Sequence, residues 1–106
     1  MMPENTILEF YQSEFKRINV KPQRGGVALQ HAAWMVEECL IFGNPKDFLL
    51  VDLAKVNRWI GFIQGVLWKE GIYTIDQLRQ HVVNAKEVTN ARAMVSNYWS
   101  GPDATV

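Results

Sequence analysis

Residues 58–81 restrict the fold of this chain more than any other segment, because they encode two helices and the joint between them. Apolar residues recur at helical spacing as far as Leu67, and a glycine at position 71 then provides a left-handed stop. After a two-residue joint, a capping box over residues 74–77 begins the next helix. The segment therefore predicts a helical hairpin that turns at Gly71-Ile72-Tyr73.

The first half of the chain carries the same kinds of helix signals. A capping box from Thr6 to Glu9 predicts a first helix that ends near Asn19, ahead of a proline. A second helix is expected over residues 27–42, because Gly43 and the proline that follows it stop further turns. Both helices have apolar residues recurring on one side, so both are expected to pack against a core.

The second half has less certain boundaries. A third helix is expected from Pro45 or Asp47 to residue 70, although Phe48–Val51 also suits a short strand or an irregular connection. The fourth helix should start at Ile75. Weak helix formers in its middle leave two alternatives, one long helix to Trp99 or two shorter ones.

These patterns predict an all-α fold, a compact bundle of four to five helices in one domain over 1–106, with frayed ends at 1–5 and 100–106. The hydrophobic content of 48% is enough for a core without a disulfide or structural metal. We expect Trp59 and Trp68 to anchor this core, with Trp99 as a further candidate. The single cysteine, Cys39, lies on an apolar stripe and is also expected inside.

Charge and hydropathy argue against two classes of partner. The 11 basic and 11 acidic residues cancel, whereas nucleic-acid binding normally needs a basic excess. The longest apolar segment, Trp59–Trp68, has about half the length that spans a bilayer, so no membrane contact is expected. The first residues lack the pattern of a signal peptide, and a soluble cytoplasmic protein is expected.

One face of the third helix carries Gly61 and Gly65 at positions where glycine is costly. Each glycine destabilises a helix by about 1 kcal/mol relative to alanine, so another structure is expected to use the space. The favoured interpretation is a close crossing by another helix, from this chain or a second copy. The alternative is a shallow groove for a ligand or partner, in which Arg58 and Gln64 donate hydrogen bonds and Trp68 forms a flat wall.

The second helix carries Trp34, Glu38 and Ile41 on a face that lies away from its core stripe. Leaving Trp34 and Ile41 in water costs free energy. Two interpretations are equally supported. Either the first helix or the Phe48 segment covers this face, or the face is a subunit interface, where aromatic anchors are common.

Patterns for catalysis and metal binding are weak. His31 and Glu38 nearly share a helix face, but a metal would require a third ligand. The acidic residues at 37, 38, 47 and 52 are similar to the magnesium-binding clusters of all-helical nucleotide pyrophosphohydrolases, yet they lack two facing Glu-x-x-Glu/Asp pairs. We therefore predict no catalytic residue, no metal ligand and no cofactor.

A longer run of residues resembles small proteins encoded by tailed bacteriophages. It reads Arg58-Trp59-x-Gly61-Phe62-x-Gln64-Gly65-x-Leu67-Trp68 and continues as Gly71-x-Tyr73-Thr74-Ile75-Asp76, with a similar His31-x-x-Trp34-Met35 segment before it. The likeness covers roughly half of the chain. Those proteins have no established activity, so the resemblance implies only an accessory protein that acts inside a bacterial cell.

We predict from these observations a non-enzymatic accessory protein that binds a protein partner and self-associates. The candidate binding residues are Trp34, Glu38 and Ile41 on one surface and Arg58, Gly61, Gln64, Gly65 and Trp68 on the other. The first alternative is a protein that sequesters a nucleotide or cyclic nucleotide, with Arg24 and Arg58 at the phosphate. A weaker alternative is a metal-dependent nucleotide hydrolase.

Overall fold

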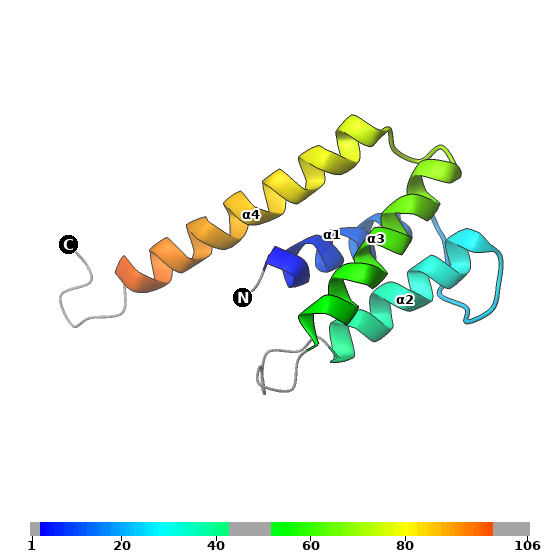
Figure 1. Cartoon of the computed structure of the whole chain (residues 1–106), viewed down its shortest axis with the longest axis horizontal. Coiled ribbons are helices and arrows are strands. Elements are labelled where there is room, and N and C mark those ends of the chain that lie inside the picture. Colours follow the sequence, from blue (N-terminus) through cyan, green and yellow to red (C-terminus); the bar gives the residue numbers. More distant parts are fainter. Residues whose placement is uncertain (1–2, 43–51, 99–106) are drawn as a thin grey trace.

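Four helices make up the part of the chain that the computed structural model describes, residues 3–42 and 52–98, with side chains described as far as residue 91 (Figure 1). They are α1 (Pro3–Arg17), α2 (Ala28–Phe42), α3 (Leu53–Lys69) and α4 (Ile75–Tyr98). These residues include no strand, which confirms the all-α prediction. None of the four helices combines the length and the apolar character needed to cross a bilayer.

The start of α1 differs from the prediction. Pro3 occupies the first position, where the missing N–H of proline costs nothing, so residues 3–5 are helical instead of frayed. Thr6 therefore lies inside the helix and does not cap it. Its side chain is buried, and its Oγ1 lies 2.7 Å from the Oγ1 of Thr89 in α4.

The end of α1 lies within two residues of the predicted position. Asn19 has a φ of 61°, a left-handed conformation that asparagine tolerates better than most residues. The Val20 N–H then donates to the Phe15 carbonyl at 2.8 Å, as in a Schellman motif. This turn brings Val20 back against the core, where it is half-buried.

The second helix agrees with its predicted range to within one residue, whereas the third begins later than predicted. Asp52 has a non-helical φ of −88° and ψ of 89°, and its Oδ1 accepts a hydrogen bond from the Lys55 N–H at 2.9 Å. It is therefore the N-cap of α3. The predicted starts at Pro45 or Asp47 are wrong, and Phe48–Val51 lies outside the described residues.

The connection between α3 and α4 contains both predicted boundary signals. Gly71 has a φ of 73°, and the Ile72 N–H donates to the Leu67 carbonyl at 2.9 Å, which closes α3. The capping box is also formed. The Thr74 N–H donates to Gln77 Oε1 at 2.8 Å, and the Gln77 N–H donates to Thr74 Oγ1 at 3.2 Å.

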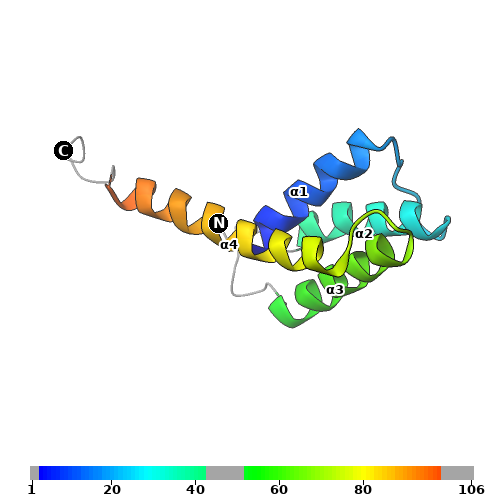
Figure 2. The same cartoon turned by 90° about the horizontal axis from the view of Figure 1, so that it is seen from above.

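The fourth helix is one continuous element from Ile75 to Tyr98, not two shorter helices. Its later turns extend beyond the other three helices in both views of the molecule (Figures 1 and 2). Trp99 and residues 100–106 lie outside the described residues.

The packing is organised around α1, which contacts α4 on one side and α2 on the other, while α3 packs along α2 (Figures 1 and 2). Among the pairs that pack, α3 and α4 touch least. The predicted hairpin is therefore an open corner instead of two helices docked along their length. The reason is that His81 and Thr89 of α4 bond to side chains of α1.

The core contains residues from all four helices, with Tyr11 and Ile63 among its largest fully buried side chains. Cys39 is also fully buried, and burial raises the pKa of its thiol to about 11, as expected for a core cysteine. Trp59 packs partly buried against this core. Trp68 contradicts the prediction, because 54% of its surface is exposed.

Candidate functional site

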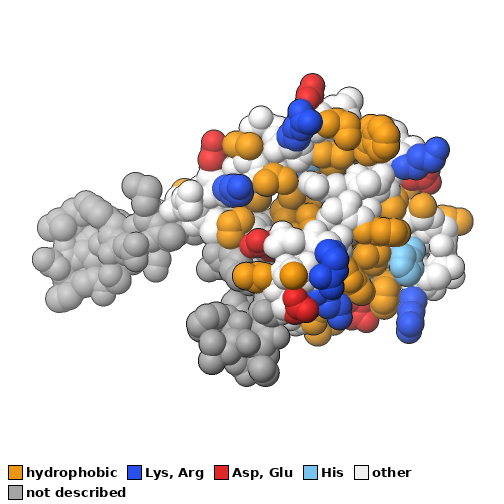
Figure 3. Space-filling view, in the orientation of Figure 1, with side chains coloured by type: hydrophobic (Ala, Val, Ile, Leu, Met, Phe, Trp, Pro, Cys, Tyr) orange, Lys and Arg blue, Asp and Glu red, His pale blue; other side chains and the backbone are white. Residues whose placement is uncertain are grey.

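The α3 outer face, formed by Arg58, Gly61, Phe62, Gly65 and Trp68, is the most prominent exposed feature of the helix. Phe62 is 53% exposed and Trp68 is 54% exposed, so two aromatic rings meet solvent on one helix. Figure 3 shows apolar side chains at the surface over α3 and the beginning of α4, next to basic ones. The helix itself carries three basic residues and no acidic residue. The face therefore combines apolar surface with positive charge.

The two glycines of this face do not seat any of the four described helices. A Cβ added at Gly61 or at Gly65 would meet no other atom of the described residues within 4 Å, and both positions are exposed. The close crossing within one chain is therefore wrong, because α2 and α1 pack against the opposite side of α3. The crossing by a second copy is still a prediction.

A groove of about 350 Å³ separates the end of α3 from the start of α4. Trp68 and Gly65 form its α3 wall, and Ile75, itself 43% exposed, lies on the α4 wall. The complete lining is Gln64, Gly65, Trp68, Ile75, Leu78, Arg79 and Val82. Arg79 is the single charged residue of this lining, so the groove is mainly apolar.

A second hollow of about 230 Å³ continues the opening along α3 and α4, and the start of α1 closes one side of it. Val82 lines both hollows, and Ile60, Ala85 and Ile7 give the second one an apolar floor. The two hollows follow from the geometry of the corner, because α3 and α4 move apart from their connection. We call the first hollow and its lining the corner groove.

Gln64 differs from its predicted role. Its side chain is half-buried, and its Nε2 donates to the Tyr11 hydroxyl at 3.0 Å and to the Leu78 carbonyl at 3.5 Å. The Tyr11 hydroxyl also lies 3.0 Å from Nδ1 of His81. Burial raises the pKa of Tyr11 to about 12, which keeps the hydroxyl protonated. Gln64 thus joins a polar cluster behind the groove and does not face a ligand freely.

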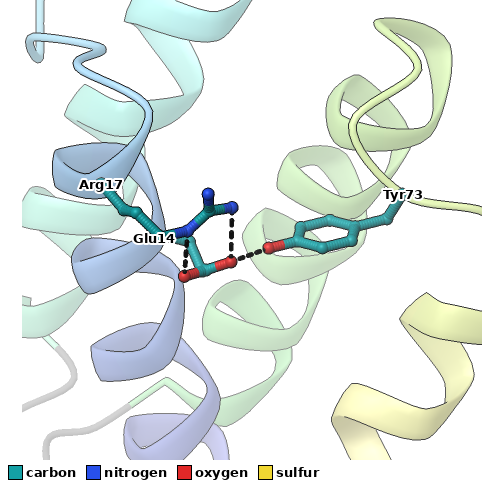
Figure 4. Close-up of polar contacts among 3 residues, drawn as sticks. All are labelled: Glu14, Arg17 and Tyr73. Atoms are coloured by element: carbon teal, nitrogen blue, oxygen red, sulfur yellow. Dashed lines mark hydrogen bonds and ion pairs between the residues drawn. The ribbon is translucent and has the colours of Figure 1, made fainter.

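A second polar contact links α1 to the connection before α4 (Figure 4). The Tyr73 hydroxyl donates to Glu14, whose carboxylate also accepts from Arg17 Nε at 3.0 Å and from its Nη2 at 3.1 Å. The Arg17 hydrogen bonds, followed by that of Tyr73, lower the pKa of Glu14. Burial and then the Glu14 contact raise the pKa of Tyr73 to about 12.

Sequence reasoning missed this cluster of Tyr11, Gln64, Tyr73 and His81. Its members come from α1, α3, the connection and α4. Tyr11 bonds to residues 53 and 70 positions away, and the Tyr73 ring packs against His81. Each residue taken alone fits an ordinary helix surface or core pattern. The sequence contains no signal for the cluster, because only the packing of α4 on α1 creates it.

The three residues of the predicted surface on α2 differ in how far the fold buries them. Trp34 is half-buried, with its ring 5.9 Å from that of Trp59 and 5.4 Å from the Arg24 guanidinium. Among the described residues, α3 and the loop before α2 therefore contribute to the cover of Trp34, and the Phe48 segment lies outside those residues. Glu38 is half-buried, and Ile41 is the one strongly exposed member of the surface, at 70%.

The candidate metal ligands are not brought together among the described residues, where no group of three or more His, Cys, Asp or Glu is placed to hold an ion. His31 Nδ1 accepts a hydrogen bond from the Gly25 N–H at 2.9 Å. Glu37 accepts one from Gln12 at 2.8 Å, and Asp52 caps α3. Asp47 lies outside the described residues.

Comparisons with protein families, with curated proteins and with solved structures found no match to this chain. The candidate site is therefore defined by its own geometry, as the α3 outer face together with the corner groove.

Proposed function

We propose that this chain is a non-enzymatic protein-binding module, and that its binding surface is the α3 outer face with the corner groove. The observation that supports this proposal best is the exposure of Phe62 and Trp68 beside a mainly apolar groove. Exposed aromatic residues around an apolar centre are typical of protein interfaces. The bare glycines between them allow a helix backbone to approach closely.

The occupant that suits this surface is a second copy of the chain. Two α3 helices crossing antiparallel, midway between Gly61 and Gly65, would bring Gly61 of each copy to Gly65 of the other. The same two-fold symmetry sets Arg58 opposite Trp68, an arrangement that favours a cation–π contact. Lys69 comes to lie opposite Asn57, so no cation of this face meets another cation. Such self-complementarity is what an isologous dimer requires.

The biological context is part of the proposal. The resemblance to tailed-bacteriophage proteins supports an accessory role in the cytoplasm of an infected bacterium. A host or phage protein would then meet the dimer, and the later turns of α4 supply a second element that extends beyond the body (Figure 1).

Light scattering on purified protein over a range of concentrations tests the dimer. We expect a dimer for the natural chain, and a dissociation constant raised by at least about tenfold, roughly 1.4 kcal/mol, in Trp68→Ala and in Gly61→Leu. Val27→Ser removes an exposed apolar residue far from α3 in sequence and should leave the dimer intact. A natural chain that stays monomeric at high concentration overturns the proposed self-association.

A second candidate function, nucleotide binding, is favoured by one observation. The corner groove has the volume of a small-molecule site, a flat aromatic wall in Trp68 and one cation in Arg79. Ligand at about 100 times its dissociation constant would stabilise the protein by about 2.7 kcal/mol. Thermal unfolding with and without nucleotides separates the candidates, because the protein-binding module should show no shift. No feature of the described residues favours a metal-dependent hydrolase.

A further inference from the structure

The corner groove is supported from behind by a histidine enclosed in aromatic rings. His81 is half-buried on α4, and the centroid of its ring lies 4.5 Å from that of Tyr73, 4.8 Å from that of Phe10 and 5.5 Å from that of Tyr11. Phe10 and Tyr11 belong to α1 and Tyr73 to the connection. The imidazole thus lies where three parts of the chain meet, and one side of it borders a hollow of about 120 Å³ between α1 and α4.

The hydrogen bonds of this cluster favour one arrangement of its protons. Gln64 Nε2 donates to the Tyr11 hydroxyl, and its approach to the Leu78 carbonyl fixes the same end of the amide as the donor. The hydroxyl accepts that bond and is free to donate its own proton to His81 Nδ1, 3.0 Å away. In this arrangement His81 is neutral and carries its proton on Nε2.

Protonation of His81 is incompatible with this arrangement. An imidazolium donates from both nitrogens, so Nδ1 would present a proton to a hydroxyl that already directs its own proton there. Tyr11 is fully buried, so water does not supply another acceptor. The titratable groups facing the ring are Tyr11 and Glu14 from α1 and Tyr73 from the connection, whereas α3 contributes only the neutral Gln64. Glu14 already bonds to Arg17 and Tyr73.

The same cluster is part of the wall of the binding surface. Gln64 and Leu78 both line the corner groove, and Gln64 is the residue that would lose its acceptor when the Tyr11 hydroxyl turns. We infer that His81 is a pH-sensitive latch, in which uptake of a proton breaks the bond to Tyr11, releases Gln64 and changes the shape of the corner groove. The consequence for binding rests on the proposed function, whereas the structural change does not.

Nuclear magnetic resonance of the full chain between about pH 8 and about pH 5 tests the latch, since histidine titrates in this range. The side-chain amide of Gln64 and the indole N–H of Trp68 should shift with the midpoint of His81. In Tyr11→Phe the Gln64 response to His81 should be lost. In His81→Gln both pH responses should disappear, and in His31→Gln they should persist. Gln64 and Trp68 signals that do not move while His81 titrates would overturn the latch.

The two proposals fail separately in this design. Light scattering over the same pH range should show self-association weakened by roughly tenfold at the acidic end, and His81→Gln should remove that change. A monomer whose Gln64 signal still follows His81 would keep the latch and remove the dimer. A dimer with no pH response at Gln64 would keep the dimer and remove the latch.

Discussion

A buried contact between two threonines joins the start of α1 to α4. Thr89 Oγ1 donates to the Ala85 carbonyl at 2.8 Å, which leaves it as the acceptor for the Thr6 hydroxyl at 2.7 Å. Both residues are buried, so the contact forms away from water. The contact also explains why Thr6 does not cap α1, because its hydroxyl is used inside the fold.

Replacing both of these threonines should therefore cost less than the two single replacements added together. We expect Thr89→Val to lower the free energy of unfolding by about 0.5–1.5 kcal/mol, because it removes the buried hydrogen bond between Thr6 and Thr89. The double variant Thr6→Val with Thr89→Val should be less destabilised than the sum of the single variants. Urea denaturation of the four proteins measures this coupling. Strictly additive losses would contradict the assigned contact.

The glycines of α3 and of its end show how the same residue type serves different purposes within one element. Gly71 has a positive φ, which residues with a side chain rarely adopt, so glycine is needed at this position to close α3. Gly61 and Gly65 have ordinary helical conformation and open space around them. Nothing in the part of the chain that the structure describes requires glycine there, which supports the proposed interface.

This contrast predicts opposite effects of alanine. Gly71→Ala should destabilise the protein by about 1–2 kcal/mol, the cost of a left-handed L residue. Gly61→Ala should stabilise the dissociated chain by about 1 kcal/mol, because alanine favours the helix. Denaturation of dilute protein, below the dissociation constant, checks both. A destabilised Gly61→Ala variant would show that the space beside Gly61 is occupied in the monomer.

For the whole molecule, acid stability depends on the charges that packing buries or pairs. Burial lowers the pKa of His81 below its ordinary value of 6.5, with Glu14 opposing in part. Pairing with Arg17 and then Tyr73 lowers the pKa of Glu14 below 4.5. In both cases the unfolded chain binds the proton at a higher pH than the folded chain. Stability is therefore lost in two steps as the pH falls.

We expect the free energy of unfolding to be highest above the ordinary pKa of histidine, 6.5, and to fall as the pH drops towards the lowered pKa of folded His81. A second fall should begin below 4.5, where unfolded glutamate takes up protons. Urea denaturation at a series of pH values measures both falls. His81→Gln should remove the first and keep the second, and an unchanged first fall would refute the assignment.

Comparison of the two capping boxes explains how much could be read from sequence. The box at Thr74 is formed as predicted, since residues 71–73 leave no way for a helix to continue into it. The same pattern at Thr6 was misleading, because Pro3 starts the helix earlier and the threonine bonds to a residue 83 positions away. Local signals were reliable where the neighbouring residues agreed with them.

The candidate site was predictable only in part, because spacing along a helix shows which residues share a face but not whether that face is exposed. Helical spacing correctly grouped Arg58, Gly61, Gly65 and Trp68 on one side of α3. It could not tell that this side faces solvent, nor that Trp34 of α2 is covered by Trp59. Exposure depends on which helix faces which, and α1 instead of α3 became the neighbour of α4.

The sequence by itself determined that the chain is helical and where α2 and the α3–α4 connection begin and end, because these depend on interactions within a few residues. The tertiary structure alone decided the corner between α3 and α4, the exposure of Phe62 and Trp68, and the cluster around His81. Those features require α1 to pack between α2 and α4. Contacts between residues 53 to 83 positions apart create them, and no local pattern encodes such pairs.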